Sequence, residues 1–211
     1  MGYDYDQTHE RIIESAKKHF MENGFLGASI RQICKDAGVT NGAFYAHFES
    51  KEDLFSKIVK PCVDKMQSLY SDENQNYMDI KSVGDVKKAI DRTFSSNSVL
   101  IRYIFENSET FKLILTAGSG TEYENFVETL AKDEAVNTMK FLKQCRPYLK
   151  NKAKISEGLI QRISYFTVSS VFDGLSKGKT EEEVLKECEL TSEFCIAGLK
   201  RKSAISFFET A

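Results

Sequence analysis

Residues 24–52 decide the fold, and they read GFLGASIRQICKDAGVTNGAFYAHFESKE. Apolar residues recur three and four positions apart here, which is the spacing of one face of an α-helix. Gly24 and Gly38 each follow a run with that spacing, and glycine ends helices readily because it accepts a left-handed backbone. The stretch therefore predicts short helices separated by sharp turns.

Polar residues suited to capping stand where these helices are expected to begin. Ser29 and Gln32 match a capping box, in which the serine oxygen binds a free amide at the helix start. Thr40 precedes a predicted helix over 41–48, and Ser50 precedes another. The helix that begins at Ser29 and the helix that follows Thr40 are joined by a tight turn, which predicts a helix-turn-helix.

Helical spacing continues along the rest of the chain, without strand-like alternation. We predict an all-α fold with an N-terminal three-helix helix-turn-helix DNA-binding domain over 1–50 and a C-terminal helical bundle over 51–211. The polar run 95–98 leaves open whether one helix is interrupted. The further helices are predicted over 8–23, 50–73, 83–106, 109–117, 122–145, 155–176 and 180–204.

The composition is that of an ordinary folded protein, with 41% hydrophobic and 28% charged residues. The formal net charge of −2 provides no global attraction for nucleic acid, so any DNA contact requires positive groups gathered on one face. No apolar run reaches the ~20 residues that span a bilayer, and no signal peptide is evident. We expect a cytoplasmic protein. The five cysteines lack CxxC spacing and are expected to be reduced and mostly buried, and the sequence assigns them no role.

Enzyme chemistry finds no support in the sequence. The three histidines, His9, His19 and His47, all lie in the first fifty residues, so no histidine is available near the later acidic or cysteine residues. The glycine-rich segment 118–120 lacks the strand and helix of a phosphate-binding loop. We therefore expect no catalytic residue, no cofactor and no metal site.

Residues 11–58 resemble the DNA-binding domain of the TetR family of repressors. The resemblance covers about a quarter of the chain and depends on many residues at fixed spacing. The matching residues are Gly24-Phe25, Ser29-Ile30-Arg31-Gln32-Ile33-Cys34, Ala37-Gly38-Val39-Thr40-Asn41-Gly42-Ala43-Phe44-Tyr45, His47-Phe48 and Ser50-Lys51-Glu52.

The helix after Thr40 has the side chains that a recognition helix needs. Gly42, Ala43 and Ala46 are small, which lets this helix enter a major groove ~12 Å wide. Tyr45 and His47 carry groups that can donate to phosphates. The alternatives to phosphate contact are that Tyr45 belongs to the core and that His47 is an exposed residue without a function.

The resemblance adds roles to individual positions. It implies that Tyr45, His47 and Lys51 hold the DNA backbone and that Ser29 and Thr40 touch phosphates while capping helices. It also implies base contacts, and these would come from Asn41, Ala43, Ala46 and Arg31. Arg31 is equally well explained as a solvated surface residue. The family often has a larger or polar residue where Ala46 stands, so readout of DNA shape is expected to contribute.

The resemblance implies that the C-terminal bundle over 51–211 is a helical ligand-binding and dimerisation domain, and this part matches the family only in being helical and of similar length. Tyr103, Phe126 and Tyr165 are candidate ligand-binding residues, although aromatic residues at helical spacing more often belong to a core. The last two helices are expected to form a homodimer interface. Residues Phe166, Ser170 and Gly174 are placed to face the partner, or to pack within the chain.

These patterns predict a DNA-binding repressor, active as a homodimer on double-stranded operator DNA. A small-molecule ligand is expected to move the helix over 50–73 and release the palindromic operator. The alternative is a helical adaptor that binds a ligand or a protein and has lost DNA binding. The sequence leaves open the ligand, the operator, the regulated genes, and whether the ligand releases or strengthens the grip on DNA.

Overall fold

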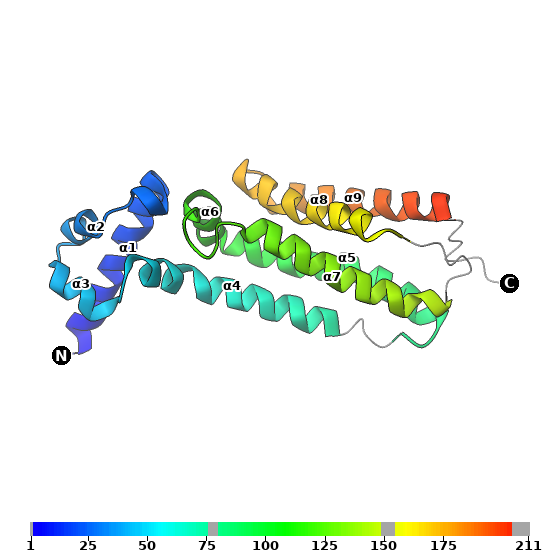
Figure 1. The fold of residues 1–211 in the computed structure, drawn as a ribbon, viewed down its shortest axis with the longest axis horizontal. Coiled ribbons are helices and arrows are strands. Elements are labelled where there is room, and N and C mark those ends of the chain that lie inside the picture. The colour runs from blue at the N-terminus through cyan, green and yellow to red at the C-terminus, as the bar shows by residue number, and fades with distance from the viewer. Residues whose placement is uncertain (1, 76–79, 149–154, 204–211) are drawn as a thin grey trace. The chain divides into compact units, whose positions relative to one another are not determined.

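The computed structural model describes residues 2–75, 80–148 and 155–203, and its regular elements in these ranges are all helical (Figure 1). This agrees with the predicted all-α fold. The elements are α1 (Gly2–Gly27), α2 (Ile30–Asp36), α3 (Asn41–His47), α4 (Lys51–Gln75), α5 (Val83–Glu106), α6 (Ser108–Ala117), α7 (Phe126–Cys145), η1 (Arg146–Tyr148), α8 (Glu157–Ser176) and α9 (Glu181–Ser203).

Packing divides the chain into two compact units. The first unit comprises Met1–Lys65 and Asn107–Phe126, and the second comprises Met66–Glu106 and Val127–Ala211. The first unit therefore takes the start of α4 and all of α6 in addition to the first three helices. The sequence predicts a functional boundary between residues 50 and 51, and that boundary stays a prediction.

Helix α1 forms because Ile12, Ala16 and Phe20 make one apolar stripe, and each of these side chains is fully buried. Gly24 breaks the regular helix as predicted, with φ 69, and one more helical turn follows it. The helix begins at Gly2 and so extends well before the predicted start at residue 8. This first segment is polar and carries no apolar stripe that would have revealed it.

The predicted helix-turn-helix is present, with one local difference. Gly38 takes φ 67 between α2 and α3, and Thr40 Oγ1 accepts a hydrogen bond from the Ala43 amide at 3.1 Å. The capping box predicted at Ser29 is wrong, because the Ser29 side chain makes no cap hydrogen bond. The Gln32 amide, which that side chain would have bound, donates to the Ser29 carbonyl at 3.0 Å instead.

The later helix boundaries follow local polar contacts. The Ser50 hydroxyl caps α4 by accepting from the Asp53 amide at 3.0 Å, as predicted. Helix α7 begins at Phe126 and not at residue 122, because Thr121 forms a turn in front of it. The Thr121 hydroxyl donates to the Gly118 carbonyl at 2.6 Å and accepts from the Tyr123 amide at 3.1 Å. Helix α5 continues through residues 95–98 without interruption.

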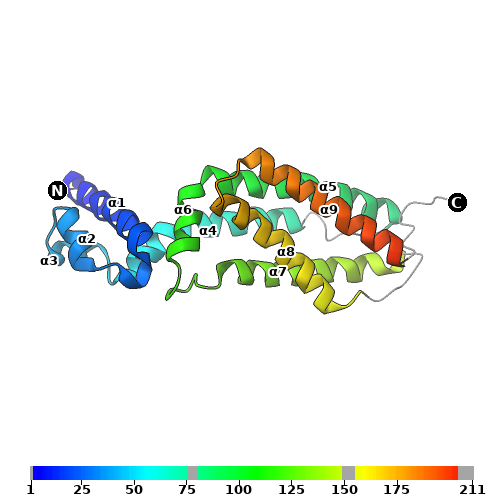
Figure 2. The ribbon, with the colours of Figure 1, turned by 90° about the horizontal axis from the view of Figure 1, so that it is seen from above.

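The core of the first unit is aromatic. The rings of Phe20, Phe25 and Phe55 form a triangle with centroid separations of 5.2–5.8 Å. These rings come from both sides of the Gly24 break and from α4, so they join the two ends of the helix-turn-helix segment. Figure 2 shows α1, α2 and α3 gathered together within this unit.

In the second unit, α8 and α9 pack tightly through a glycine. Gly174 of α8 is buried, and a Cβ built at this position would lie 2.4 Å from Val184 Cγ2 of α9. Of the two interpretations open for Gly174, packing within the chain is therefore correct, and the close approach to α9 explains the glycine. Helix α9 also contacts α5, where Arg102 Nε lies 3.4 Å from Glu181 Oε1.

We predict that Gly174→Ala destabilises the protein by about 1–3 kcal/mol, because the added methyl group overpacks the contact with Val184. Thermal unfolding should show a melting temperature several degrees lower. Gly158→Ala on the same helix is the matched control, since a Cβ there meets nothing within 4 Å. Adding Val184→Ala to Gly174→Ala should restore part of the loss. Equal melting temperatures for the two glycine variants would contradict this packing.

Candidate nucleic-acid interface

Helix α3 depends on two phenylalanines for its position. It has seven residues, which is too short for a helix to be stable alone in water. Phe44 and Phe48 are 0% and 1% exposed, and their ring centroids lie 5.6 Å apart. The Phe48 ring also stacks on His9 of α1 at 4.8 Å. These buried rings attach one side of α3 to the domain and determine which side remains outside.

The opposite side of α3 is exposed and narrow. We call Asn41, Gly42, Tyr45 and Ala46 the outer face, because all four are exposed and lie on one side of the helix. Tyr45 is 59% exposed, so the alternative that Tyr45 belongs to the core is wrong. Gly42 and Ala46 add little width beyond the backbone. The outer face thus carries four of the predicted DNA-binding residues together, and Ala43 lies half-buried at its edge.

The end of α3 packs against the start of α1 through aromatic rings. The His47 ring centroid lies 4.0 Å from that of Tyr5 and 5.5 Å from that of His9. The Tyr5 hydroxyl donates to the Ala46 carbonyl at 3.4 Å. His47 is therefore a half-buried packing residue and not an isolated surface histidine. This contact was not predicted, because the polar residues before residue 8 show no helical spacing of apolar side chains.

The environment of His47 favours its uncharged ring. Burial lowers the pKa of His47 below its usual value of 6.5, and the neighbouring His9 lowers that pKa further. The Nδ1 atoms of both histidines are buried without a hydrogen-bond partner, so a proton added there would find no acceptor. Lys57 of α4 lies at the end of α3, where its Nζ donates to the His47 carbonyl at 3.4 Å.

Lys51 has a structural role that the sequence did not indicate. Its Nζ donates to the carbonyls of Phe25 and Ala28 at 2.7 and 2.9 Å, and it lies 4.4 Å from the Phe25 ring centroid. These carbonyls are left open where α1 ends, and a cation satisfies them well. Lys51 thus attaches the start of α4 to the corner between α1 and α2. Its predicted contact with a phosphate stays a prediction.

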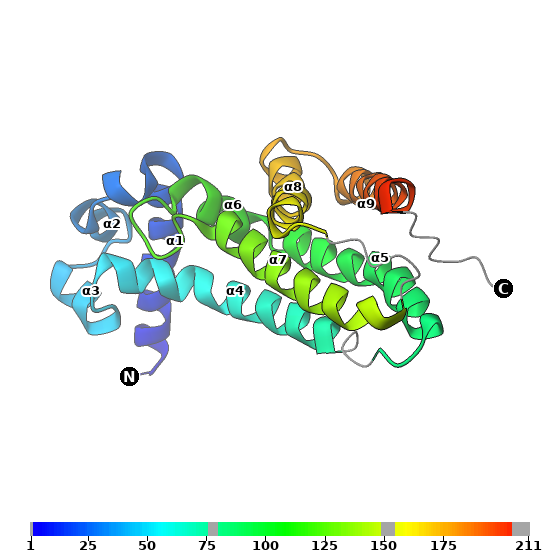
Figure 3. The same cartoon turned by 45° about the vertical axis from the view of Figure 1, so that its right-hand side comes forward.

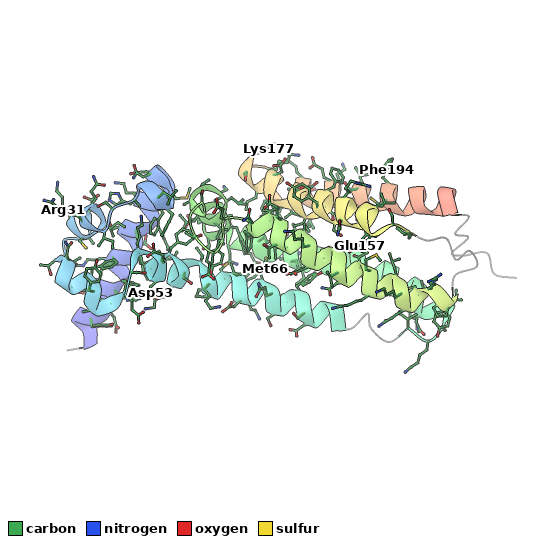
Figure 4. The ribbon with its side chains drawn as sticks, in the orientation of Figure 1. Arg31, Asp53, Met66, Glu157, Lys177 and Phe194 are labelled. Carbon is green, nitrogen blue, oxygen red and sulfur yellow. The ribbon has the colours of Figure 1, made fainter. Side chains whose placement is uncertain are left out.

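Helix α2 presents the remaining predicted DNA contacts. Arg31 is exposed, and its side chain points away from the rest of the unit (Figure 4). Ser29 is half-buried, and its hydroxyl is not used as a cap. Helix α2 is held in place by Ser15, whose hydroxyl donates to the Ile33 carbonyl at 2.9 Å, and by His19, whose Nε2 lies 2.8 Å from Asp36 Oδ2.

The three candidate ligand residues fall in different surroundings. Phe126 is buried in the first unit, where its ring centroid lies 6.2 Å from that of Phe111. Tyr103 of α5 is half-buried and Tyr165 of α8 is 48% exposed, and both belong to the second unit. A shared pocket lined by these three residues stays a prediction.

Other kinds of site find little support in the described part of the chain. No group of three or more histidine, cysteine or acidic side chains is placed to hold a metal ion in those residues. The described helices also include none with the length and apolar character required to cross a bilayer.

Comparison with known proteins agrees with this geometry. A short helix presented outward after a tight turn defines a helix-turn-helix DNA-binding domain. Residues 12–58 match the family model described as bacterial regulatory proteins, tetR family. Residues 12–58 therefore form a domain of the tetR family type.

Individual relatives carry the same domain. The chain is 28% identical over 159 residues to the uncharacterized HTH-type transcriptional regulator YuxN of Bacillus subtilis, covering 71% of this chain and 51% of that protein. It is 44% identical over 59 residues to the HTH-type transcriptional regulator UidR of Escherichia coli, covering 28% of this chain and 30% of UidR. The chain thus matches about half the length of the first relative and less than a third of the second.

The fold extends the likeness beyond the first domain. The structure of NalD, the secondary repressor of the MexAB-OprM multidrug efflux pump in Pseudomonas aeruginosa, matches with a TM-score of 0.58 at 17% identity. The match covers 90% of this chain and 97% of NalD, so the two proteins share the helical architecture along nearly their whole length.

We predict that acidification destabilises the chain through His47. Above pH 6.5 its ring is neutral in both the folded and the unfolded chain, so it contributes no difference there. As the pH falls below that value, the unfolded chain takes up the proton first, because the folded pKa is lower. The melting temperature should fall as the pH is lowered from about 7.5 to 5.5. The melting temperature of His47→Gln should fall less over the same range. An identical fall in both proteins would contradict the assignment.

Proposed function

We propose that this protein is a transcription repressor that binds a palindromic operator as a homodimer and leaves it when a small molecule binds. The observation that carries the proposal is the outer face of α3, a slim exposed surface fixed from behind by Phe44 and Phe48. A repressor works where the chromosome is, so the proposal places the protein in the cytoplasm. The match of residues 12–58 to the tetR family model also supports a role in regulating transcription.

The outer face has the dimensions and chemistry for a major groove. The ~12 Å groove admits an α-helix, and small side chains let the backbone approach the base edges. Asn41 is suited to adenine, Ala46 to a thymine methyl group, and Tyr45 to a phosphate. With only one amide in this set, direct base contacts are few, and DNA shape would supply part of the specificity. Arg31 on α2 would add a guanine contact or a phosphate contact beside the groove.

The proposed dimer uses exposed apolar side chains on the last two helices. Large apolar residues stand open to solvent on α8 and α9, and Phe194 is 80% exposed and points outward (Figure 4). Apolar surface of this kind is costly in water and is covered when two copies associate. A two-fold dimer would present two α3 helices to successive grooves, ~34–36 Å apart or slightly more. The side chains concerned are Leu159, Tyr165, Phe166, Leu190 and Phe194.

Helix α4 provides the link between ligand and DNA in this proposal. It runs without a break from Lys51 to Gln75 and contributes residues to both compact units. Its first residue binds the corner between α1 and α2 through the Lys51 ammonium group. A ligand that shifts the far half of α4 would pull on this corner and change the spacing of the paired α3 helices. Coupling of this kind typically amounts to ~1–3 kcal/mol.

We predict that Gly42→Leu abolishes specific DNA binding and leaves the fold intact. A Cβ at Gly42 meets only Thr40 Oγ1 at 3.8 Å, an ordinary contact, so the larger side chain fits the free protein and projects from the outer face. It would occupy the space that the base edges require. Operator affinity, measured by fluorescence anisotropy on DNA selected from the region around the gene, should fall more than about tenfold.

Gly84→Leu is the matched control for this variant. Gly84 is the second residue of α5, as Gly42 is of α3, and it is also exposed. This variant should bind the operator like the unmodified protein. If both variants keep full affinity, the outer face does not enter DNA, and the helical adaptor becomes the better interpretation.

We predict that Phe194→Lys weakens dimerisation, because a charge would then have to be buried in the interface. Analytical ultracentrifugation should show a larger monomer fraction, and the operator affinity should fall with it. Val136→Lys is the control, since Val136 is 52% exposed but lies on α7, outside the proposed interface. A dimer that tolerates Phe194→Lys as well as Val136→Lys would place the interface elsewhere.

A further inference from the structure

A cluster of polar side chains joins α4 to α7 inside the second unit. Tyr70 comes from the last turns of α4, and Glu134, Asn137 and Thr138 come from adjacent turns of α7. The two helices run beside each other in this region (Figures 1 and 3). The proposed repressor mechanism uses none of these residues, and they are separate from the candidate ligand residues predicted from the sequence.

The hydrogen bonds in this cluster all point toward the Glu134 carboxylate. The Tyr70 hydroxyl donates to Glu134 Oε2, and the Thr138 hydroxyl donates to Glu134 Oε1 at 3.0 Å. Asn137 Nδ2 donates to the Tyr70 oxygen at 3.1 Å, which leaves the Tyr70 proton for Glu134. Both carboxylate oxygens thus accept one bond from a neutral donor. An ionised carboxylate offers about four acceptor positions, so each oxygen retains capacity for another donor.

Glu134 has no cation beside it among the described residues. Both of its hydrogen-bond partners are hydroxyl groups. Charged neighbours do not contribute to the pKa of Glu134, which burial raises above the usual value for glutamate. Other acidic residues behave differently: Asp64 and Asp173 pair with lysines on the surface. Glu134 keeps part of its surface exposed, so the residue is not sealed inside the unit.

A desolvated carboxylate without a counter-charge is costly, and such groups concentrate at functional sites. A ligand cation would remove the cost, because it would supply both the missing charge and the missing donors. A neutral ligand could fill only the donor positions. An anionic ligand would be repelled. The neutral donors already present would hold the carboxylate in one orientation for the incoming group.

We propose that the Glu134 cluster is the head-group site for an organic amine, whose ammonium group donates to the open acceptor positions of the Glu134 carboxylate. The ligand class is a primary or secondary amine with an apolar body, because the head group must leave water to reach a desolvated position. If the chain is the repressor proposed above, this amine would be its effector. Binding of the amine itself does not depend on that function.

Three probes that share one apolar body and differ only in the head group test the proposal. They are 4-phenylbutylamine, 4-phenylbutanol and 5-phenylpentanoate, titrated into the full chain at neutral pH by calorimetry. We expect the amine to bind about tenfold more tightly than the alcohol, as one charge-assisted hydrogen bond would provide. We expect the carboxylate probe to bind most weakly of the three.

Two variants of α7 locate the binding. Glu134→Gln removes the charge and should reduce the preference for the amine over the alcohol to about twofold or less. Asp133→Asn removes one charge from the next residue, which is exposed, and should leave the preference unchanged. Circular dichroism of both variants confirms that they are folded. Glu134→Asp keeps the charge and should retain part of the preference even if the amide variant is unstable.

The proposal is overturned if the amine fails to bind, or if it binds no better than the alcohol. An undiminished amine preference in Glu134→Gln would also overturn it. In the first two cases the cluster is only a structural connection between α4 and α7. Operator binding is measured separately with the same protein. Operator binding without amine binding leaves the proposed function standing, and amine binding without operator binding leaves the site standing.

Discussion

The burial of Phe44 and Phe48 is the interaction on which the rest of the first unit's function depends. A helix of seven residues cannot maintain its own structure, so its shape and its orientation come from these two rings. With the rings inside, Asn41, Gly42, Tyr45 and Ala46 on the opposite side of α3 are exposed. The same burial that stabilises the domain therefore creates the outer face, and no separate device is needed to present it.

Several polar contacts then fix the helices around those rings. Lys51 spans from α4 to the carbonyls of Phe25 and Ala28, and Tyr5 reaches from α1 to the end of α3. Each contact uses a group that DNA-binding domains commonly direct at phosphates, here turned toward the protein's own backbone. Contacts from α1 and α4 therefore help to hold the helix-turn-helix in place.

The sequence predicted the turn and the helix cap correctly where these depend only on neighbouring residues. Gly38 and Thr40 act within four residues of where they stand, and the turn and cap they form could be read directly from the sequence. Ser29 shows the limit of such reasoning, because the amide it was expected to cap found the backbone carbonyl instead. Gly42, Tyr45 and Ala46 are exposed on one side of α3, as predicted, whereas Ala43 and His47 were expected on that side and are half-buried.

Contacts between distant residues could not be predicted in this way. Tyr70 and Glu134 are 64 positions apart, and Tyr5 and Ala46 are 41 apart, so only the packing of helices brings each pair together. The packing role of Gly174 could not be predicted for the same reason, because its closeness to Val184 depends on how α8 meets α9.

The central claim is that α3 lies in the major groove, and chemical interference mapping of the bound DNA tests it most directly. DNA bound by the protein is selected from the region around its gene and partially methylated with dimethyl sulfate, which marks guanine N7 in the major groove and adenine N3 in the minor groove. The account predicts interference at guanine N7 in two half-sites about one helical turn apart, or a little more. Interference confined to adenine N3, or a single site without symmetry, would contradict it.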